Sequence, residues 1–260
     1  MKKNIVITSG GTSEYIDKVR KITNSGTGKL GSMIANEFAL RDDIDTIFYI
    51  HTPKAILPKF NTNVNLILIE VTDTKSVKNV VEKILIENNI SIFIHSMAIS
   101  DYYVDYVSTA SLLTKELNMS QDIEKTLKNA TNKLDNSSKL SSTEDNLIVV
   151  LKQTPKIINL IKKISPNTKL IGFKLLENVS NEYLFEIAKN LMKKNNCDYV
   201  VANDLKTIKN GNHKAFLLNN KNDTIIEMNG KKNIAKVITK NVWKSTLIYT
   251  EIYKFLFLKV

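Results

Sequence analysis

The chain has 260 residues, of which 43% are hydrophobic, and its formal net charge at pH 7 is +11. This length and apolar content suit one large α/β domain, or a domain with a modest appendage, and no apolar run is long enough to span a bilayer. A single cysteine, Cys197, excludes internal disulfides and metal sites built from several cysteines. The start MKKNIVIT lacks the apolar stretch of a signal peptide, so a cytoplasmic protein is expected.

The first half of the chain alternates short apolar runs with amphipathic stretches. Residues 4–8 form a branched, fully apolar run typical of a buried parallel strand, and further strands are predicted over 44–50, 64–70 and 90–96. Helices are predicted from about Gly28 or Lys29 and over 73–88, where Asp73 or Thr74 is a suitable N-cap. This rhythm favours a doubly wound, Rossmann-like, mostly parallel sheet of the α/β class.

A polar, lysine-rich segment interrupts this pattern at about residues 109–142, with at most a weak helix. It is too long for an ordinary connection, so we expect either a mobile lid or an excursion from the sheet.

Regular patterning then returns. Strands are predicted over 146–152, 169–174 and 198–204, and helices over 154–164, with Pro155 in the first turn, and over 180–196, with Ser180 as the cap. Two short strands form a hairpin at about residues 213–229, and a last helix covers 231–256. The hairpin lies at the edge of the sheet, which predicts pairing with a second subunit in a homodimer. The whole chain, 1–260, is interpreted as one domain.

Ligands of open α/β sheets bind beyond the carboxyl ends of the strands, so the residues that follow each predicted strand are the candidates. SGGT follows the first strand at 9–12, HSMAISD ends at Asp101, and AND closes the strand over 198–204. Phe173 and Lys174 end the strand before it. None of these positions carries a catalytic triad, and the three histidines show no metal-binding spacing.

The run TNSGTGKLG, residues 23–31, matches a dinucleotide fingerprint through Gly26, Gly28 and Gly31. The match fails on context, because the motif should stand in the first strand-to-helix turn, and a P-loop fails at Thr23 and Leu30. Glycines that open a helix still form an anion-binding N-terminus, which a nucleotide phosphate fits.

Two alternatives remain open from the residues alone. One is an NAD(P)-dependent reductase that uses the glycine motif. The other is a nucleic-acid-binding module that uses the positive charge, although the lysines are scattered over predicted helix faces without interleaved aromatic residues. The interpretation favoured here is a lysine-rich surface that also suits small anionic substrates.

Several runs together resemble a known family. ITSGGTSEYIDKVRKITNSGTGKLG, HSMAISDYYVD, SKLSS, LKQTPKII, LIGFKLLE and CDYVVANDL are similar, in order and spacing, to phosphopantothenate–cysteine ligases in their stand-alone bacterial form. The resemblance covers residues 4 to about 237. It implies a homodimeric enzyme of coenzyme A biosynthesis that joins 4′-phosphopantothenate and cysteine through an acyl-nucleotidylate. CTP or ATP would be the co-substrate with Mg²⁺, and pyrophosphate and the nucleoside monophosphate would be released, with no nucleic-acid or membrane partner.

The resemblance also implies roles for single residues. Asn24 would hold the acyl-nucleotidylate, and Lys139 in the polar segment would stabilise charge in the first step. Arg20, in cis or across a dimer interface, and Ala98 would contact substrate. The nucleotide would be bound by the other matched residues, which are Gly10, Gly26, Gly28, Gly31, Asp101, Phe173 and Asn203. No metal ligand is implied, and each residue also has a plainer structural role, such as turn geometry for the glycines or core packing for Phe173.

Overall fold

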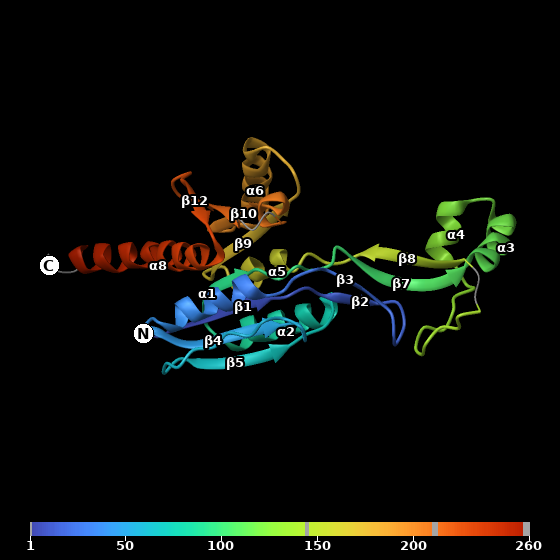
Figure 1. Cartoon of the computed structure of the whole chain (residues 1–260), viewed down its shortest axis with the longest axis horizontal. Helices are drawn as coiled ribbons and strands as arrows, with labels where there is room; N and C mark the ends of the chain where they lie inside the picture. Colours follow the sequence, from blue (N-terminus) through green and yellow to red (C-terminus); the bar gives the residue numbers. More distant parts are fainter. Residues whose placement is uncertain (1, 144–145, 210–212, 257–260) are drawn as a thin grey trace.

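The computed structural model describes residues 2–143, 146–209 and 213–256, and the side chains up to Trp243 (Figure 1). Its centre is an eight-stranded sheet in the order β12-β11-β10-β9-β6-β1-β4-β5. The parallel strands are β1 (Lys3–Ser9), β4 (Ile44–His51), β5 (Asn65–Glu70), β6 (Ile90–His95), β9 (Lys169–Leu176) and β10 (Tyr199–Asp204). The hairpin β11 (Lys214–Asn219) and β12 (Ile225–Asn229) adds two antiparallel strands at one edge. The predicted Rossmann-like, mostly parallel sheet is confirmed.

Helices cover both faces of this sheet. One core layer joins α1 (Lys29–Ala39) and α8 (Lys231–Leu256) to the sheet, through residues such as Phe38 and Ile238. The other joins α2 (Thr74–Glu87), α5 (Ile158–Ile164) and α6 (Asn181–Asn195) to the opposite face. Among the described residues, no helix is long and apolar enough to cross a membrane.

The predicted caps hold at two helices and fail at a third. Asp73 closes a capping box on α2, and the Ser180 hydroxyl accepts a hydrogen bond from the Tyr183 amide at the start of α6. Helix α5 begins only at Ile158, so the prediction of Pro155 in its first turn is wrong. The residue before a proline is kept extended, and Thr154 is also held there by its amide, which donates to the Asp101 carbonyl at 3.0 Å.

Between β6 and α5 the chain leaves the sheet and forms what we call the arm, residues 102–143 and 146–153. Its stem is an antiparallel pair, β7 (Tyr102–Thr109) and β8 (Leu147–Gln153), with α3 (Ala110–Ser120) and α4 (Ile123–Asn129) at its far end. Figure 1 shows the arm projecting from the body, next to the small hairpin of β2 (Ser13–Tyr15) and β3 (Lys21–Thr23).

The arm differs from the sequence-based expectations in three ways. The excursion begins at Tyr102 rather than at residue 109, and it contains two helices where at most a weak one was expected. The predicted strand over 146–152 exists, but its partner is β7 and not the central sheet. Local alternation identifies a strand without identifying its partner, and the arm forms a small core of its own around Tyr106, Leu113 and Ala130.

Candidate functional site

The candidate site lies where the strand order reverses. From β1 the sheet grows through β4 to β5 on one side, and through β6, β9 and β10 on the other. Just beyond the carboxyl ends of β1 and β6, Gly11 and Ala98 form an isolated parallel bridge. The Ala98 amide donates to the Gly10 carbonyl at 2.9 Å, and the Thr12 amide donates to the Ala98 carbonyl at 3.0 Å. Backbone therefore builds the floor of the crevice in which open α/β sheets bind ligands.

Glycines allow two loops to touch backbone to backbone above this floor. A Cβ atom on Gly11 would lie 1.9 Å from the Asn24 carbonyl oxygen, and one on Gly26 would lie 2.5 Å from the Gly10 carbonyl oxygen. Gly10 itself has φ +97, in the left-handed region that glycine adopts without strain. Packing alone thus requires glycine at these positions, before any phosphate contact is considered.

The start of helix α1 faces the same crevice. Gly28 is its N-cap, with φ 70, and no side chain caps the helix there. The Ser9 hydroxyl donates to the Gly28 carbonyl at 3.0 Å, and a Cβ atom on Gly31 would lie 2.5 Å from that hydroxyl oxygen. An uncapped helix start held against a strand end is a favourable position for an anion, because its amides and the helix dipole both carry positive partial charge.

A cavity of about 370 Å³ occupies this crevice. Seven of the predicted site residues line it, namely Gly10, Gly26, Gly28, Gly31, Ala98, Phe173 and Asn203. They come from the ends of β1, β6, β9 and β10 and from the start of α1. The lining also holds the hydroxyls of Ser9, Ser25, Thr27 and Ser96, and the cations Lys29 and Lys231. No carboxylate is among the described lining residues, so the cavity suits an anion.

Asn24 and Asp101 lie near the cavity but do not line it. The Asn24 amide donates to the Thr12 carbonyl at 3.0 Å, and its side-chain Nδ2 donates to the Ala98 carbonyl at 3.4 Å. Asn24 is therefore one residue away from the lining, on the floor itself. Asp101 points outward, with 68% of its side chain exposed, and forms an ion pair with Lys156.

Arg20 and Lys139 are brought together at the arm rather than at the cavity. Arg20 binds the buried Asp17 carboxylate with two donors, at 2.6 and 2.9 Å, and donates to the Leu140 carbonyl at 3.2 Å. The Leu140 amide donates to the same Asp17 carboxylate at 3.1 Å. These hydrogen bonds, with Arg20 as the first cause, hold the pKa of Asp17 well below its usual range. Lys139, the next residue, is exposed and does not line the cavity.

His213 also lines the cavity, although the sequence analysis found only that the three histidines lack a metal-binding spacing. Both of its ring nitrogens are buried, and neither has a hydrogen-bond partner in the part of the chain that the structure describes. Burial, reinforced by the nearby Lys231 charge, lowers the pKa of His213. No local sequence pattern indicates this position, because it depends on the hairpin strand β11 running antiparallel to β10, with Ala215 opposite Asn203. That pairing places the start of β11 beside the end of β10.

Buried titratable groups outside the cavity fit packing roles. Cys197 is fully buried, and burial raises the pKa of its thiol to about 12, which suits a packed side chain and not a nucleophile. Burial lowers the pKa of His95 to about 4, so its ring is neutral at pH 7. Within the described part of the chain, no group of three His, Cys, Asp or Glu residues could hold a metal ion.

Comparisons with known proteins agree with this geometry. The model of the family described as DNA/pantothenate metabolism flavoprotein C-terminal domain matches residues 1–136 and 130–246. The coenzyme A biosynthesis bifunctional protein CoaBC of Thermococcus kodakarensis is 30% identical over 204 residues, which are 78% of this chain and 42% of that protein. The CoaBC protein of Borreliella burgdorferi is 28% identical over 244 residues, 92% of this chain and 52% of its own length. The chain thus spans about half the length of the curated relatives it matches.

Solved structures show the same fold. The crystal structure of the DNA/pantothenate metabolism flavoprotein from Streptococcus pneumoniae is 34% identical, with a TM-score of 0.78, and the match covers 94% of this chain and 100% of that one. A Cab2 mutant in complex with phosphopantothenate-cysteine is 17% identical, with a TM-score of 0.67, over 97% of this chain and 89% of that one. At that identity, the second match speaks for the fold alone.

Proposed function

The chain belongs to the family of the DNA/pantothenate metabolism flavoprotein C-terminal domain, and from this premise we propose that it is a phosphopantothenate–cysteine ligase of coenzyme A biosynthesis. It would join 4′-phosphopantothenate and cysteine with CTP or ATP as co-substrate. The observation that carries the proposal is the cavity at the reversal of strand order, which is lined by seven residues matched to the ligase motifs. The glycine motif would then bind a nucleotide triphosphate, not a nicotinamide cofactor.

In the first proposed step, a carboxylate oxygen of phosphopantothenate attacks the α-phosphorus of the nucleotide. A new P–O bond forms, the bond from the α-phosphorus to the bridging oxygen breaks, and pyrophosphate leaves with that oxygen and its electron pair. The protein has to neutralise charge and align the two anions, and it needs no nucleophile of its own. The start of α1, Lys29 and the hydroxyls around it suit this task.

In the second proposed step, the amine of cysteine attacks the acyl carbon of the nucleotidylate. The C–O bond to the nucleoside monophosphate breaks, and the amine loses a proton as the amide forms. Asn24 would hold the acyl-nucleotidylate for this step, since its side chain reaches the Ala98 carbonyl on the floor of the cavity. Its side-chain amide can both donate and accept hydrogen bonds, as an intermediate with carbonyl and phosphate oxygens requires.

We propose that Mg²⁺ enters the site bound to the nucleotide triphosphate. The described lining of the cavity holds no carboxylate, so these residues do not form a protein-built magnesium site.

The remaining proposals concern the arm and the oligomer. We propose that the segment over 109–142 acts as a lid that carries Lys139 to the phosphates, either within one subunit or in a homodimer.

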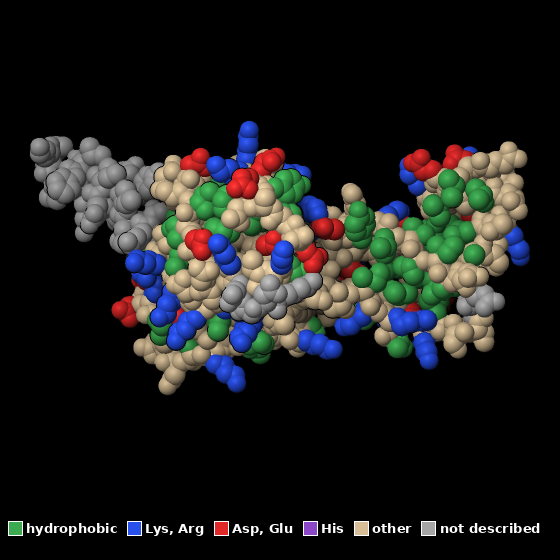
Figure 2. Space-filling view, turned by 45° about the horizontal axis from the view of Figure 1, so that its top comes forward, with side chains coloured by type: hydrophobic (Ala, Val, Ile, Leu, Met, Phe, Trp, Pro, Cys, Tyr) green, Lys and Arg blue, Asp and Glu red, His purple; other side chains and the backbone are tan. Residues whose placement is uncertain are grey.

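The outer edge strand β12, in which Ile225 is 39% exposed, is the proposed pairing edge of the homodimer. The arm offers a rival apolar surface on which Tyr102 and Leu151 are exposed, and Figure 2 shows hydrophobic side chains gathered over the arm. Light scattering on Ile225→Glu and Leu151→Glu variants would decide which surface forms a dimer.

The test of the ligase function is a pyrophosphate-release assay. Purified protein receives 4′-phosphopantothenate, cysteine and Mg²⁺ with either CTP or ATP, and omission of phosphopantothenate is the control. Pyrophosphate release that depends on phosphopantothenate is expected with at least one nucleotide, and its absence with both would refute the proposal. Fluorescence titration with NADH tests the reductase alternative, which the family match does not favour, and salt-dependent binding of DNA or RNA tests the nucleic-acid alternative.

A further inference from the structure

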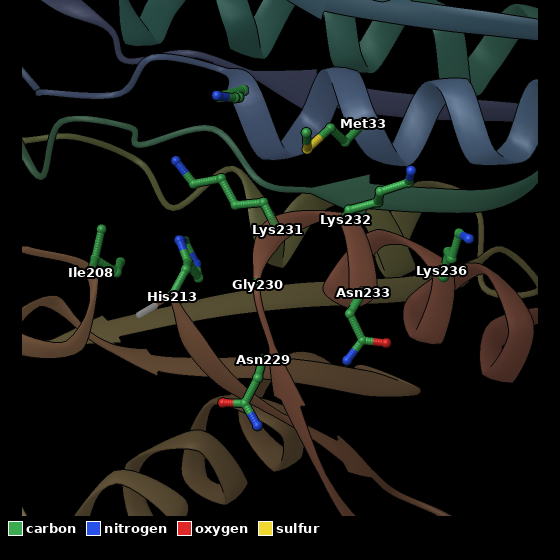
Figure 3. A pocket seen from close by; sticks show the side chains of 10 residues that line it. Met33, Ile208, His213, Asn229, Gly230, Lys231, Lys232, Asn233 and Lys236 are labelled. Atoms are coloured by element: carbon green, nitrogen blue, oxygen red, sulfur yellow. The ribbon is translucent and has the colours of Figure 1, made fainter. Parts of the chain in front are cut away.

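A second cavity, of about 710 Å³, opens beside the first, between helix α1, the short helix α7 (Leu205–Lys209) and the turn from β12 into α8 (Figure 3). We call it the lysine pocket and define it by its cations and one histidine, which are Lys29, His213, Lys231, Lys232 and Lys236. Figure 3 shows the Lys231 side chain extending toward the space beside His213, and that of Lys232 turned toward α1. The starts of α1 and α8, which are distant in sequence, thus bring four lysines to one concave surface.

None of these lysines has an anionic partner among the described residues. Some lysines elsewhere on the body do have one, since Lys189 lies 2.9 Å from an Asp223 oxygen and Lys214 lies 2.9 Å from a Glu227 oxygen. No Asp or Glu is among the described residues that line the pocket. Four like charges around one hollow repel one another, and a bound polyanion would relieve that repulsion.

His213 adds an observation that is independent of the lysines. Its two ring nitrogens are buried and have no hydrogen-bond partner among the described residues, although each could donate or accept one. A buried polar group without a partner is costly, and such groups are often completed by a ligand. The ring lines the pocket on the side where Lys231 extends.

The lysine pocket is continuous with the candidate nucleotide cavity. Lys29, Ile208, His213 and Lys231 line both. Lys29 is the first residue of α1, directly after the glycines that would hold the nucleotide phosphates, and Lys231 is the first residue of α8. A phosphate chain that starts at the glycine loop can therefore extend past two helix starts into the pocket, with cations on each side.

We propose that the lysine pocket binds condensed phosphate, specifically the β- and γ-phosphates of the nucleotide and then the pyrophosphate that the first step releases. The proposal rests on the proposed function and adds a place for the leaving group. When the bond from the α-phosphorus breaks, the negative charge that grows on the pyrophosphate oxygens is met by Lys29, Lys231 and Lys236. The acyl-nucleotidylate remains at the glycine loop, with its acyl carbon open to cysteine.

The test is the binding of inorganic pyrophosphate and tripolyphosphate by isothermal titration calorimetry, without other substrates. The variant K231A/K236A removes two pocket lysines, and K83A/K163A removes two exposed lysines from α2 and α5, on the opposite face of the sheet. Both variants lose two positive charges, so a general effect of net charge on pyrophosphate binding would be the same in both. Thermal unfolding of both verifies that they fold.

We expect the pocket variant to bind pyrophosphate at least about tenfold more weakly than wild type, because each lysine that contacts a phosphate makes a charge-assisted hydrogen bond. The control variant should bind pyrophosphate within about twofold of wild type. Equal pyrophosphate affinity in the two variants, or no binding by wild type, would overturn the proposal. A wild-type protein that binds pyrophosphate at the pocket but releases none in the ligase assay would refute the ligase function and leave the phosphate site standing.

Discussion

Around the cavity, backbone packs directly on backbone. The arm, in contrast, is held to the β2–β3 hairpin by hydrogen bonds from side chains that lie partly at the surface. At the cavity, the loops at 9–12 and 24–31 leave no room for a Cβ atom at Gly11 or Gly26. At the arm, the link to the β2–β3 hairpin depends on Asp17, Arg20 and the backbone of Leu140, and 42% of the Arg20 side chain is exposed. The first arrangement is preorganised and tolerates little change. The second can open at low cost, as a lid must.

The largest expected effect comes from breaking the backbone contact at the cavity. A Gly11→Ala substitution places a Cβ atom 1.9 Å from the Asn24 carbonyl oxygen, and the two loops have to separate. We expect a loss of about 3 kcal/mol or more in the free energy of unfolding, measured by urea denaturation, together with loss of nucleotide binding.

The matched control is Gly230→Asn at the turn into α8. Gly230 has φ +80 but nothing within 4 Å of an added Cβ atom, and asparagine tolerates the left-handed region. Its cost should stay below about 1 kcal/mol. If the two substitutions cost the same, the tight contact between the loops is not what stabilises the cavity.

The next effect is on chemistry without a change in fold. An Asn24→Ala substitution removes the side chain that donates to the Ala98 carbonyl. We expect acyl-nucleotidylate formation to remain measurable and the second step to slow on the order of 100-fold, as for the loss of one donor to a developing charge. Quenched-flow assays that follow pyrophosphate and product separately would measure the two steps. Normal turnover would show that Asn24 serves the structure of the floor alone.

A smaller effect is expected on the arm side. A Lys139→Gln substitution should slow the first step roughly tenfold, because one charge-assisted contact to the nucleotide is lost. Lys125→Gln, which changes an exposed lysine of the same arm, is the control and should leave the rate unchanged. If the lid acts across a dimer, a mixture of the two impaired variants Asn24→Ala and Lys139→Gln should have more activity than the sum of its separate parts. A mixture with no more activity than its parts would favour action within one subunit.

The cavity was largely predictable from the sequence because each of its parts follows a local rule. Strand ends are visible as apolar runs that stop, and parallel strands bring those ends to one edge, so Phe173 and Asn203 could be grouped before their contacts were known. His213 was missed because the hairpin register, which sets Ala215 opposite Asn203, is a long-range property.

The arm was less predictable because its structure depends on pairing between distant segments. Strand β8 was expected, but its antiparallel pairing with β7 joins residues that are 38 to 51 positions apart, as with Thr109 and Leu147 or Tyr102 and Gln153. Its placement next to the β2–β3 hairpin then decides where Lys139 lies. The polar composition of residues 109–142 indicated that this segment lies outside the core. It could not indicate that the segment contacts the β2–β3 hairpin.

The smallest expected effect tests the hydrogen bonds of Asp17 and Arg20 that hold the arm to the β2–β3 hairpin. Arg20 holds the pKa of Asp17 well below its usual range, so this carboxylate stabilises the folded state above its unfolded pKa of about 4. The stabilisation is lost as the pH falls from there through the lower folded pKa. An Arg20→Gln substitution reduces the pKa difference between the folded and unfolded states. We therefore expect a modest loss of stability at pH 7 and a flatter decline of stability below about pH 4.

Two measurements test this contact between the arm and the hairpin. Hydrogen exchange at the Leu140 amide, which donates to Asp17, should be faster in Arg20→Gln than in wild type at pH 7. Thermal unfolding between pH 5 and pH 3 should give the flatter profile. Lys128→Gln, which breaks the exposed ion pair with Glu124 on the same arm, should change neither. Arg20→Lys keeps the charge without the planar fork, and an intermediate exchange rate in this variant would assign the fastening to the two-donor geometry and not to charge alone.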